Sequence, residues 1–162
     1  MRALVLLLGS SIAYAEPIEH STEVAVAAYG RHVEDTNAGT APDIDRMGSA
    51  FEAKVGYRVQ RRVTVGMFAE LGGFDRDPAM RSAAQVAAGA YADLHLAPSN
   101  DLDPWFELGF GSGYEQLRAQ FGVDVRANDH VALAPVVGAA YANNPGEPEW
   151  LISAGVLVRI KP

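Results

Sequence analysis

The sequence contains no cysteine among its 162 residues, which excludes a disulfide framework and a lipid anchor attached to cysteine. Long hydrophobic runs are scarce as well. The one apolar run, residues 3–12, has about half of the ~20 residues that a membrane-spanning helix needs. Basic residues are outnumbered, 13 against 20 acidic ones, which argues against nucleic acid as a partner because phosphates attract a basic surface. If the chain enters a membrane, it must therefore cross it as strands.

The first residues have the three parts of a secretory signal peptide. Arg2 precedes the apolar run, and Ala13-Tyr14-Ala15 supplies small residues before Glu16. We therefore expect residues 1–15 to be a cleaved signal peptide. We expect residues 16–162 to form one domain, because no composition shift or linker divides them.

Residues 51–71 have the clearest pattern in the chain. Apolar residues occupy alternate positions over residues 51–60 and again over residues 63–71, and the intervening residues are mainly charged, polar or glycine. Such period-two alternation is typical of a strand with one apolar face. Because only Arg61 and Arg62 separate the two stretches, we interpret them as an antiparallel hairpin with one apolar and one charged face.

The same pattern fits six further segments, so the sequence predicts an all-β fold of eight antiparallel strands. The predicted strands are residues 22–33, 51–60, 63–72, 85–95, 106–115, 117–126, 130–139 and 150–159. Long polar segments at residues 34–48 and 73–81 alternate with short turns at residues 61–62 and 127–129. Pro135 lacks a ladder donor inside the seventh strand, and a β-bulge there would reconcile it with the pairing.

The charged residues of these strands fall on one set of alternate positions. Seven acids and six bases nearly neutralise one another, which favours a paired network on a shared interior surface over a solvated face. Eight strands leave an interior that side chains fill, so we expect ion pairs to plug the lumen. The predicted network consists of Glu23, Arg31, Glu52, Lys54, Arg58, Glu70, Asp93, Glu107, Glu115, Arg118, Asp124, Arg126 and Arg159.

Alternation alone does not show which face is inside, since a soluble exported lipocalin-like barrel around a small apolar ligand gives the same pattern. Strands of about ten residues, tilted by about 45°, fit a bilayer. Glycines are frequent on the charged face, as a narrow interior requires. Aromatic residues of the apolar face gather near the strand ends, as interfacial girdles do. These residues are Phe51, Tyr57, Phe106, Tyr114, Tyr141 and Trp150. Together the features favour an apolar face that points outward into lipid.

The segments Leu108-Gly-Phe-Gly-Ser-Gly-Tyr114 and Phe121-Gly-Val-Asp-Val-Arg126 resemble the fifth and sixth strands of the small eight-stranded outer-membrane barrels of Gram-negative bacteria, the OmpA/OmpX type. The resemblance implies an eight-stranded antiparallel up-and-down transmembrane barrel in the outer membrane. It also implies outer-membrane lipid and the barrel insertion machinery as partners, and a role in envelope integrity or surface contact. One departure is the end of the chain, Arg159-Ile160-Lys161-Pro162, which lacks the terminal aromatic residue usual in that family.

The sequence gives little support to catalysis, and we expect no cofactor, metal or catalytic residue. No two of His20, His32, His95 and His130 have metal-ligand spacing. An outer-membrane lipid-modifying enzyme is a further alternative, but Ser112 and His32 belong to strands on opposite sides of an eight-stranded barrel. Acidic loop residues are a candidate site for divalent cations or a surface partner, against the alternative of simple solvation. They are Glu34, Asp35, Asp43, Asp45, Asp75 and Asp77.

Overall fold

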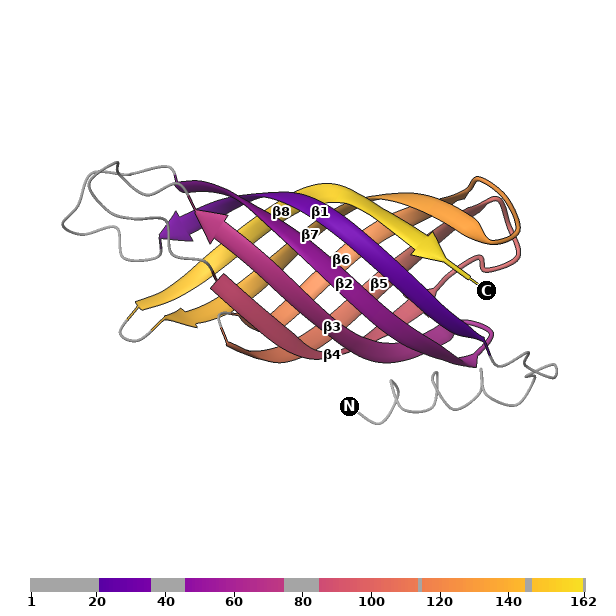
Figure 1. The fold of residues 1–162 in the computed structure, drawn as a ribbon, viewed down its shortest axis with the longest axis horizontal. Coiled ribbons are helices and arrows are strands. Elements are labelled where there is room, and N and C mark those ends of the chain that lie inside the picture. The colour runs from indigo at the N-terminus through magenta and orange to yellow at the C-terminus, as the bar shows by residue number, and fades with distance from the viewer. Residues whose placement is uncertain (1–20, 36–45, 75–84, 114, 145–146, 162) are drawn as a thin grey trace, which may run out of the picture.

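The computed structural model describes residues 21–35, 46–74, 85–113, 115–144 and 147–161. Eight antiparallel strands form one closed barrel (Figure 1). The strands are Thr22–Asp35 (β1), Arg46–Gln60 (β2), Val63–Phe74 (β3), Gln85–His95 (β4), Leu102–Gly113 (β5), Glu115–Arg126 (β6), Val131–Asn144 (β7) and Glu147–Ile160 (β8). No helix within the described residues is long and apolar enough to cross a membrane.

Each strand pairs with its neighbours in the sequence, and β1 also pairs with β8 to close the barrel. The predicted all-β, up-and-down arrangement of eight strands is therefore confirmed. Several strands are longer than predicted, since β2 begins at Arg46, β5 begins at Leu102 and β7 continues to Asn144. The alternation of apolar residues fades at these ends, but the backbone ladder continues because each strand still satisfies the peptide groups of its neighbour.

The barrel has two different ends. The short turns after β2, β4 and β6 lie at one end together with the C-terminus (Figure 1), and we name it the short-turn end. Strands β1, β3, β5 and β7 finish at the other end, which we name the long-loop end. Local hydrogen bonds close the short turns. In the turn before β7, the Asn128 side chain accepts hydrogen bonds from the backbone N–H groups of His130 at 2.8 Å and Val131 at 2.9 Å.

Pro135 is accommodated without the predicted bulge, and that prediction is wrong. The residue pairs with Val156 of β8, and the register is unchanged on both sides of it. It has no partner in the β6 ladder, because proline lacks the backbone N–H that would donate a hydrogen bond there. Irregular register occurs elsewhere, between Arg58 and Gln60 and between Glu115 and Leu117.

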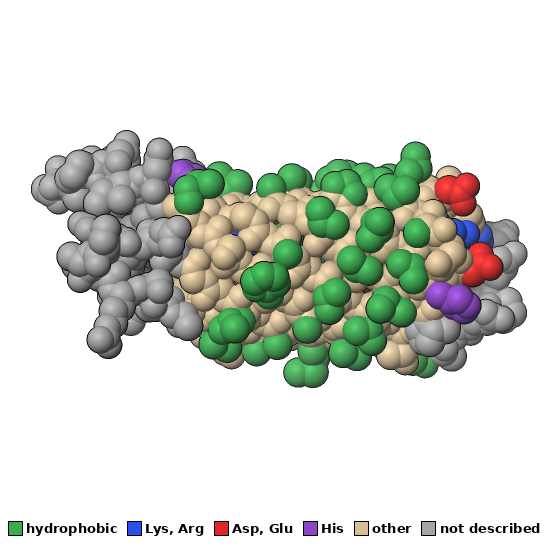
Figure 2. All heavy atoms as spheres, turned by 45° about the horizontal axis from the view of Figure 1, so that its top comes forward, with side chains coloured by type: hydrophobic (Ala, Val, Ile, Leu, Met, Phe, Trp, Pro, Cys, Tyr) green, Lys and Arg blue, Asp and Glu red, His purple; other side chains and the backbone are tan. Residues whose placement is uncertain are grey.

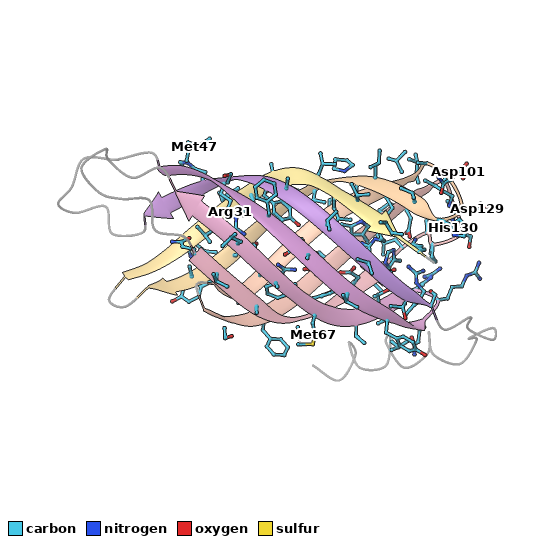
Figure 3. The ribbon with its side chains drawn as sticks, viewed as in Figure 1. Arg31, Met47, Met67, Asp101, Asp129 and His130 are labelled. Carbon is cyan, nitrogen blue, oxygen red and sulfur yellow. The ribbon has the colours of Figure 1, made fainter. Side chains whose placement is uncertain are left out.

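The apolar positions of every strand point away from the barrel. Among the described residues, 25 large apolar side chains are between 40% and 71% exposed. They include Val55, Met67 and Val156 in mid-strand, and Met67 projects from the outer wall (Figure 3). Figure 2 shows hydrophobic side chains spread over the middle of one face, with acidic, basic and histidine side chains gathered at one end and a histidine at the other. We name this surface the apolar belt.

Inside the barrel, large side chains fit because glycines face them. Trp105 is fully buried, and a Cβ added at Gly122 would lie 2.5 Å from its Cζ2 atom. A Cβ at Gly66 would lie 2.7 Å from the ring of Tyr91. A methyl group at either position would overlap an aromatic ring, so the frequent glycines of the charged face make room for rings in the lumen.

Candidate functional site

The centre of the lumen holds a closed ring of four charges. Lys54 Nζ lies 2.6 Å from a carboxylate oxygen of Glu107 and 3.2 Å from one of Glu52. Arg118 pairs with Glu52 and, at 2.6 Å, with Glu107. All four side chains are at most 2% exposed. Each acid contacts two bases and each base contacts two acids, so the charges balance within the ring.

Neutral groups hold this ring in place. The Tyr29 hydroxyl donates a hydrogen bond to Glu52 at 3.0 Å, and Lys54 donates one to the side-chain oxygen of Gln120 at 3.1 Å. The Gln120 amide in turn donates to the Tyr29 hydroxyl at 3.3 Å. Buried charges are tolerated only where pairing and additional hydrogen bonds replace their hydration. Glu52 and Lys54 meet that condition, while Glu107 and Arg118 are each paired with two opposite charges.

The strand register places acids directly opposite acids, which would be repulsive without bases from elsewhere. The facing pairs are Glu52 with Glu70, Asp93 with Glu107, and Asp103 with Asp124. Two of the neutralising bases come from strands that are not adjacent to that of the acid: Arg31 of β1 pairs with Glu70 of β3, and Arg159 of β8 reaches Asp93 of β4. These two ion pairs therefore connect walls of the barrel that share no backbone ladder.

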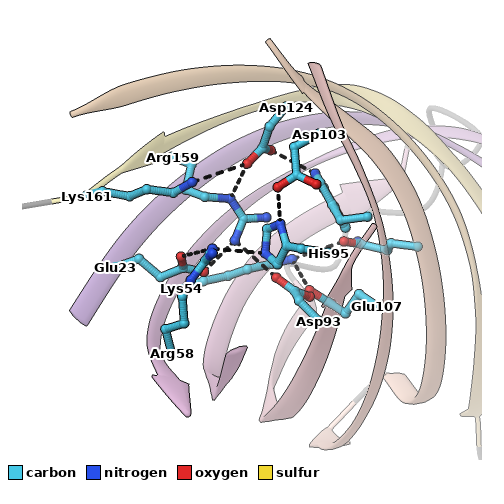
Figure 4. Close-up of polar contacts among 12 residues, drawn as sticks. Glu23, Lys54, Arg58, Asp93, His95, Asp103, Glu107, Asp124, Arg159 and Lys161 are labelled. Atoms are coloured by element: carbon cyan, nitrogen blue, oxygen red, sulfur yellow. Dashed lines mark hydrogen bonds and ion pairs between the residues drawn. The ribbon is translucent and has the colours of Figure 1, made fainter. Parts of the chain in front are cut away.

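A second cluster surrounds Arg159 nearer the short-turn end (Figure 4). Its guanidinium lies 2.5 Å from Glu23, 3.1 Å from Asp93 and 3.2 Å from Asp124, and the residue is 1% exposed. Lys161, which follows β8, lies 3.9 Å from Asp124. One guanidinium thus joins carboxylates of three different strands.

The short-turn side of this cluster contains a buried histidine. Nδ1 of His95 lies 2.7 Å from Asp103, and the other oxygen of Asp103 accepts a hydrogen bond from the backbone N–H of Ala97 at 3.0 Å. Arg58 lies 3.4 Å from Nε2 of His95 and 3.4 Å from Glu23. This chain of contacts joins the lumen network to the turn between β4 and β5.

Aromatic rings contact the buried bases. The indole N–H of Trp105 donates to Asp124 at 2.8 Å, and the Arg159 guanidinium lies 5.2 Å from the Trp105 ring centroid. The Arg118 guanidinium lies 3.5 Å from the centroid of Phe68. These distances fit cation–π attraction, which is stronger in a desolvated interior than in water. The rings thus add to the stabilisation that the carboxylates give these bases.

The structure brings most of the predicted network together. Ten of its members are buried, namely Glu23, Arg31, Glu52, Lys54, Glu70, Asp93, Glu107, Arg118, Asp124 and Arg159. The Arg58 side chain is 12% exposed. The prediction for Arg126 is wrong: it is the last residue of β6, where the wall ends, and its exposed side chain donates to the Pro98 carbonyl at 3.5 Å. The Glu115 side chain lies outside the described residues.

Sequence reasoning missed several polar members of the lumen. Asp103 and Trp105 are absent from the predicted network because strand five was predicted to begin at Phe106, although both share the alternate positions of Glu107. His95 is also absent from the predicted network, although it lies within the predicted fourth strand, and its buried bond to Asp103 makes it part of the network. The polar positions of a longer fifth strand would have identified Asp103 and Trp105.

Five of the six predicted girdle residues can be placed. Phe51, Tyr57, Phe106 and Trp150 point outward and are between 41% and 67% exposed. Tyr141 packs edge-on against Trp150, with ring centroids 5.5 Å apart. Tyr114 lies outside the described residues, as do residues 1–15 and the side chains of the acidic loop residues.

Among the described residues, two buried groups have ligand atoms within 4.8 Å of one another: Glu23, Asp93 and His95, and His95, Asp103 and Asp124. Arg159 already pairs with three of these carboxylates, so its guanidinium supplies the positive charge that a metal ion would supply. Nor is His95 arranged as a catalytic base, since its ring contacts Asp103 and Arg58 and no hydroxyl within the described part of the chain. Ser112, on the outer wall, donates to the Ala88 carbonyl at 3.4 Å.

The short-turn end has a shallow cavity with basic walls, which we name the turn groove. Its volume is about 280 Å³. It lies between the β2–β3 and β4–β5 turns and is lined by Arg61, Arg62, Leu96, Ala97, Pro98, Ser99 and Asn100. The Arg61 guanidinium donates to the Ser99 hydroxyl, and Arg126 reaches the Pro98 carbonyl from β6. Three guanidiniums therefore gather around one turn.

Comparison with solved structures identifies the fold as that of small eight-stranded outer-membrane barrels. Neisserial surface protein A (NspA) superposes with a TM-score of 0.67 at 16% identity, covering 87% of this chain and 97% of that one. The N-terminal β-barrel domain of Pseudomonas aeruginosa OprF gives 0.52 at 14% identity, with 88% and 100% covered. Ail, the attachment invasion locus protein of Yersinia pestis, gives 0.52 at 12% identity, with 88% and 100% covered. No protein-family description and no curated protein sequence matches the chain.

Proposed function

We propose that this protein is an integral outer-membrane barrel without enzymatic activity. In this role the apolar belt contacts lipid, the ion-paired lumen holds the walls together, and the long-loop end contacts the exterior. The localisation implies export and insertion by the barrel assembly machinery. Its contribution to the cell is envelope integrity or the presentation of loops to a surface partner.

The apolar belt is the observation that carries the proposal. Large side chains such as Phe110 and Met67 are 67% and 71% exposed, whereas Glu107 is fully buried. A water-soluble monomer rarely leaves so extensive an apolar surface uncovered. A soluble lipocalin-like barrel has the opposite arrangement, with apolar side chains around its ligand. A lumen crossed by Lys54 and Arg118 offers an apolar ligand no such lining.

Substitution of Met67 tests whether the belt faces lipid. Met67→Arg should cost about 2–4 kcal/mol of folding free energy in a bilayer, because a charge near the midplane loses its hydration. In a water-soluble barrel the same outward-facing arginine should be within about 0.5 kcal/mol of wild type. Met67→Leu is the matched control. Urea unfolding from vesicles, followed by gel mobility of unboiled samples, measures the difference. Recovery of the wild-type protein in a soluble periplasmic fraction would contradict the proposal.

The closed lumen has a separate test. Because Lys54, Glu107 and Arg118 pair across the centre, we expect no large, stable conductance after reconstitution into a planar bilayer. An eight-stranded barrel filled by side chains leaves no continuous aqueous path. A reproducible nanosiemens step from purified protein would refute the plugged lumen, while leaving the membrane location intact.

Two proteins of similar structure support a surface-contact role for this chain by analogy. NspA is described as a surface protein, and Ail was solved in complex with the heparin analogue sucrose octasulfate. The loop sequences of this chain contain acids at Asp43, Asp45, Asp75 and Asp77, which favours a basic partner surface or divalent cations over a polyanion. Cell-surface binding assays with loop-deleted variants would test this role, and retention of full binding after deletion of residues 36–45 and 75–84 would exclude it.

A further inference from the structure

We propose that the turn groove binds the phosphate of an anionic phospholipid in the leaflet at the short-turn end. This inference rests on the proposed membrane location. The groove has both chemical features that a lipid headgroup requires, since guanidiniums form its walls and its edge is continuous with the apolar belt.

The basic side chains are positioned by the fold. Arg61 is bonded to the Ser99 hydroxyl, which lies on the opposite wall of the groove. Arg126 approaches the same turn from β6 through the Pro98 carbonyl. Arg62 is exposed and lines the cavity directly. The Pro98 carbonyl is neutral, so its hydrogen bond from Arg126 orients that guanidinium without removing its charge.

The apolar edge points to a membrane lipid as the source of the phosphate. Leu96 lines the groove and is 51% exposed, and Leu94 and Leu102 beside it are 41% and 57% exposed. A lipid whose acyl chain lies against these leucines has its headgroup at the level of the turn. A free inorganic phosphate has no apolar part that could contact this edge. The 280 Å³ of the cavity is several times the ~30 Å³ that one water molecule occupies, which is enough for a phosphate and part of its glycerol ester.

The distribution of charge supports a specific site. The chain has a net charge of −7, yet Arg61, Arg62 and Arg126 are concentrated around this one turn. Exposed Asp101 and Asp129 also lie at the short-turn end (Figure 3), so the whole end is not uniformly basic. Attraction to an anionic headgroup is therefore expected at the groove and not around the entire rim.

Spin-labelled lipids in vesicles test the proposal with the full protein. Wild type reconstituted into phosphatidylcholine should select spin-labelled phosphatidylglycerol over labelled phosphatidylcholine. Each basic residue near an anionic lipid is expected to contribute a factor of about five. R62Q/R126Q should reduce the selectivity about 25-fold, whereas R62K/R126K should retain most of it. D101N/D129N is a rim control that should not lower the selectivity.

The same preparations separate the two proposals. Heat-modified gel mobility and protease protection report insertion independently of lipid selectivity. An inserted wild-type barrel that shows no preference for phosphatidylglycerol, or an R62Q/R126Q variant with unchanged preference, would overturn the lipid site and leave the membrane barrel standing. Equal competition by inorganic phosphate would identify a free-anion site and also refute the inference. Failure of the wild type to insert would refute both.

Discussion

Replacement of Arg159 by methionine should destabilise the barrel strongly. Methionine fills a similar volume but leaves Glu23, Asp93 and Asp124 buried without the base that joins them. Removing one partner of a buried ion pair costs about 3–5 kcal/mol, because the remaining charge keeps its desolvation penalty. We expect a loss of that size for Arg159→Met.

The three acids should not contribute equally to this loss. Glu23 keeps its ion pair with Arg58 at 3.4 Å, and Asp124 keeps the hydrogen bond that the Trp105 indole N–H donates at 2.8 Å. Asp93 has no ion pair other than the one with Arg159 within the described residues. Neutralising it in R159M/D93N should therefore restore about 1–3 kcal/mol, the cost of one unsatisfied buried polar group.

Urea unfolding of refolded protein in vesicles provides the measurement, with tryptophan fluorescence and gel mobility as independent probes. Arg126→Met is the matched control, because Arg126 is exposed at the rim and its loss should stay within about 0.5 kcal/mol. The reasoning fails if R159M costs less than about 1 kcal/mol, or if adding D93N to it restores nothing.

Two further predictions concern how the lumen is filled. Gly122→Val should cost about 1–3 kcal/mol by overpacking against Trp105, whereas Gly73→Val, with no atom within 4 Å of an added Cβ, should be nearly neutral; equal costs in urea unfolding would contradict the packing argument. Trp105→Phe removes the 2.8 Å hydrogen bond to Asp124 and should cost about 1–3 kcal/mol. Trp150→Phe is its control on the outer wall, and similar losses for the two tryptophans would refute the role assigned to the buried indole.

The sequence predicted the barrel because period-two alternation encodes the fold directly. Each strand has to present an apolar row to one side and a polar row to the other. Residues such as Val55 and Lys54 can therefore be assigned to a face from the sequence alone, before the pairing of the strands is known. Closure of the sheet into a barrel was harder to predict, since pairing between β1 and β8 joins residues such as Val26 and Val158 that are remote in the chain. Here the resemblance to known barrels supplied what alternation could not.

The identity of the charged face was predictable, but its pairing was not. The alternate positions mark Glu52 as a polar-face residue, yet the register sets it opposite Glu70, and its bases Lys54 and Arg118 come from its own strand and from β6. Which charged side chains meet across the lumen depends on the stagger and tilt of the strands. No local sequence pattern encodes these two quantities. The strand ends were missed for a related reason, because Asp103 beside Pro104 has the composition of a turn.

The Glu23–Arg159 contact spans 136 residues and joins the first strand to the last. An open sheet that still lacks β8 has Glu23, Asp93 and Asp124 in place but not the guanidinium common to all three. Repulsion among these three carboxylates should therefore destabilise a sheet that lacks β8. Pairing of β8 with β1 should relieve it by bringing Arg159 between them. We therefore expect β8 to stabilise the closed barrel by supplying one guanidinium to all three carboxylates.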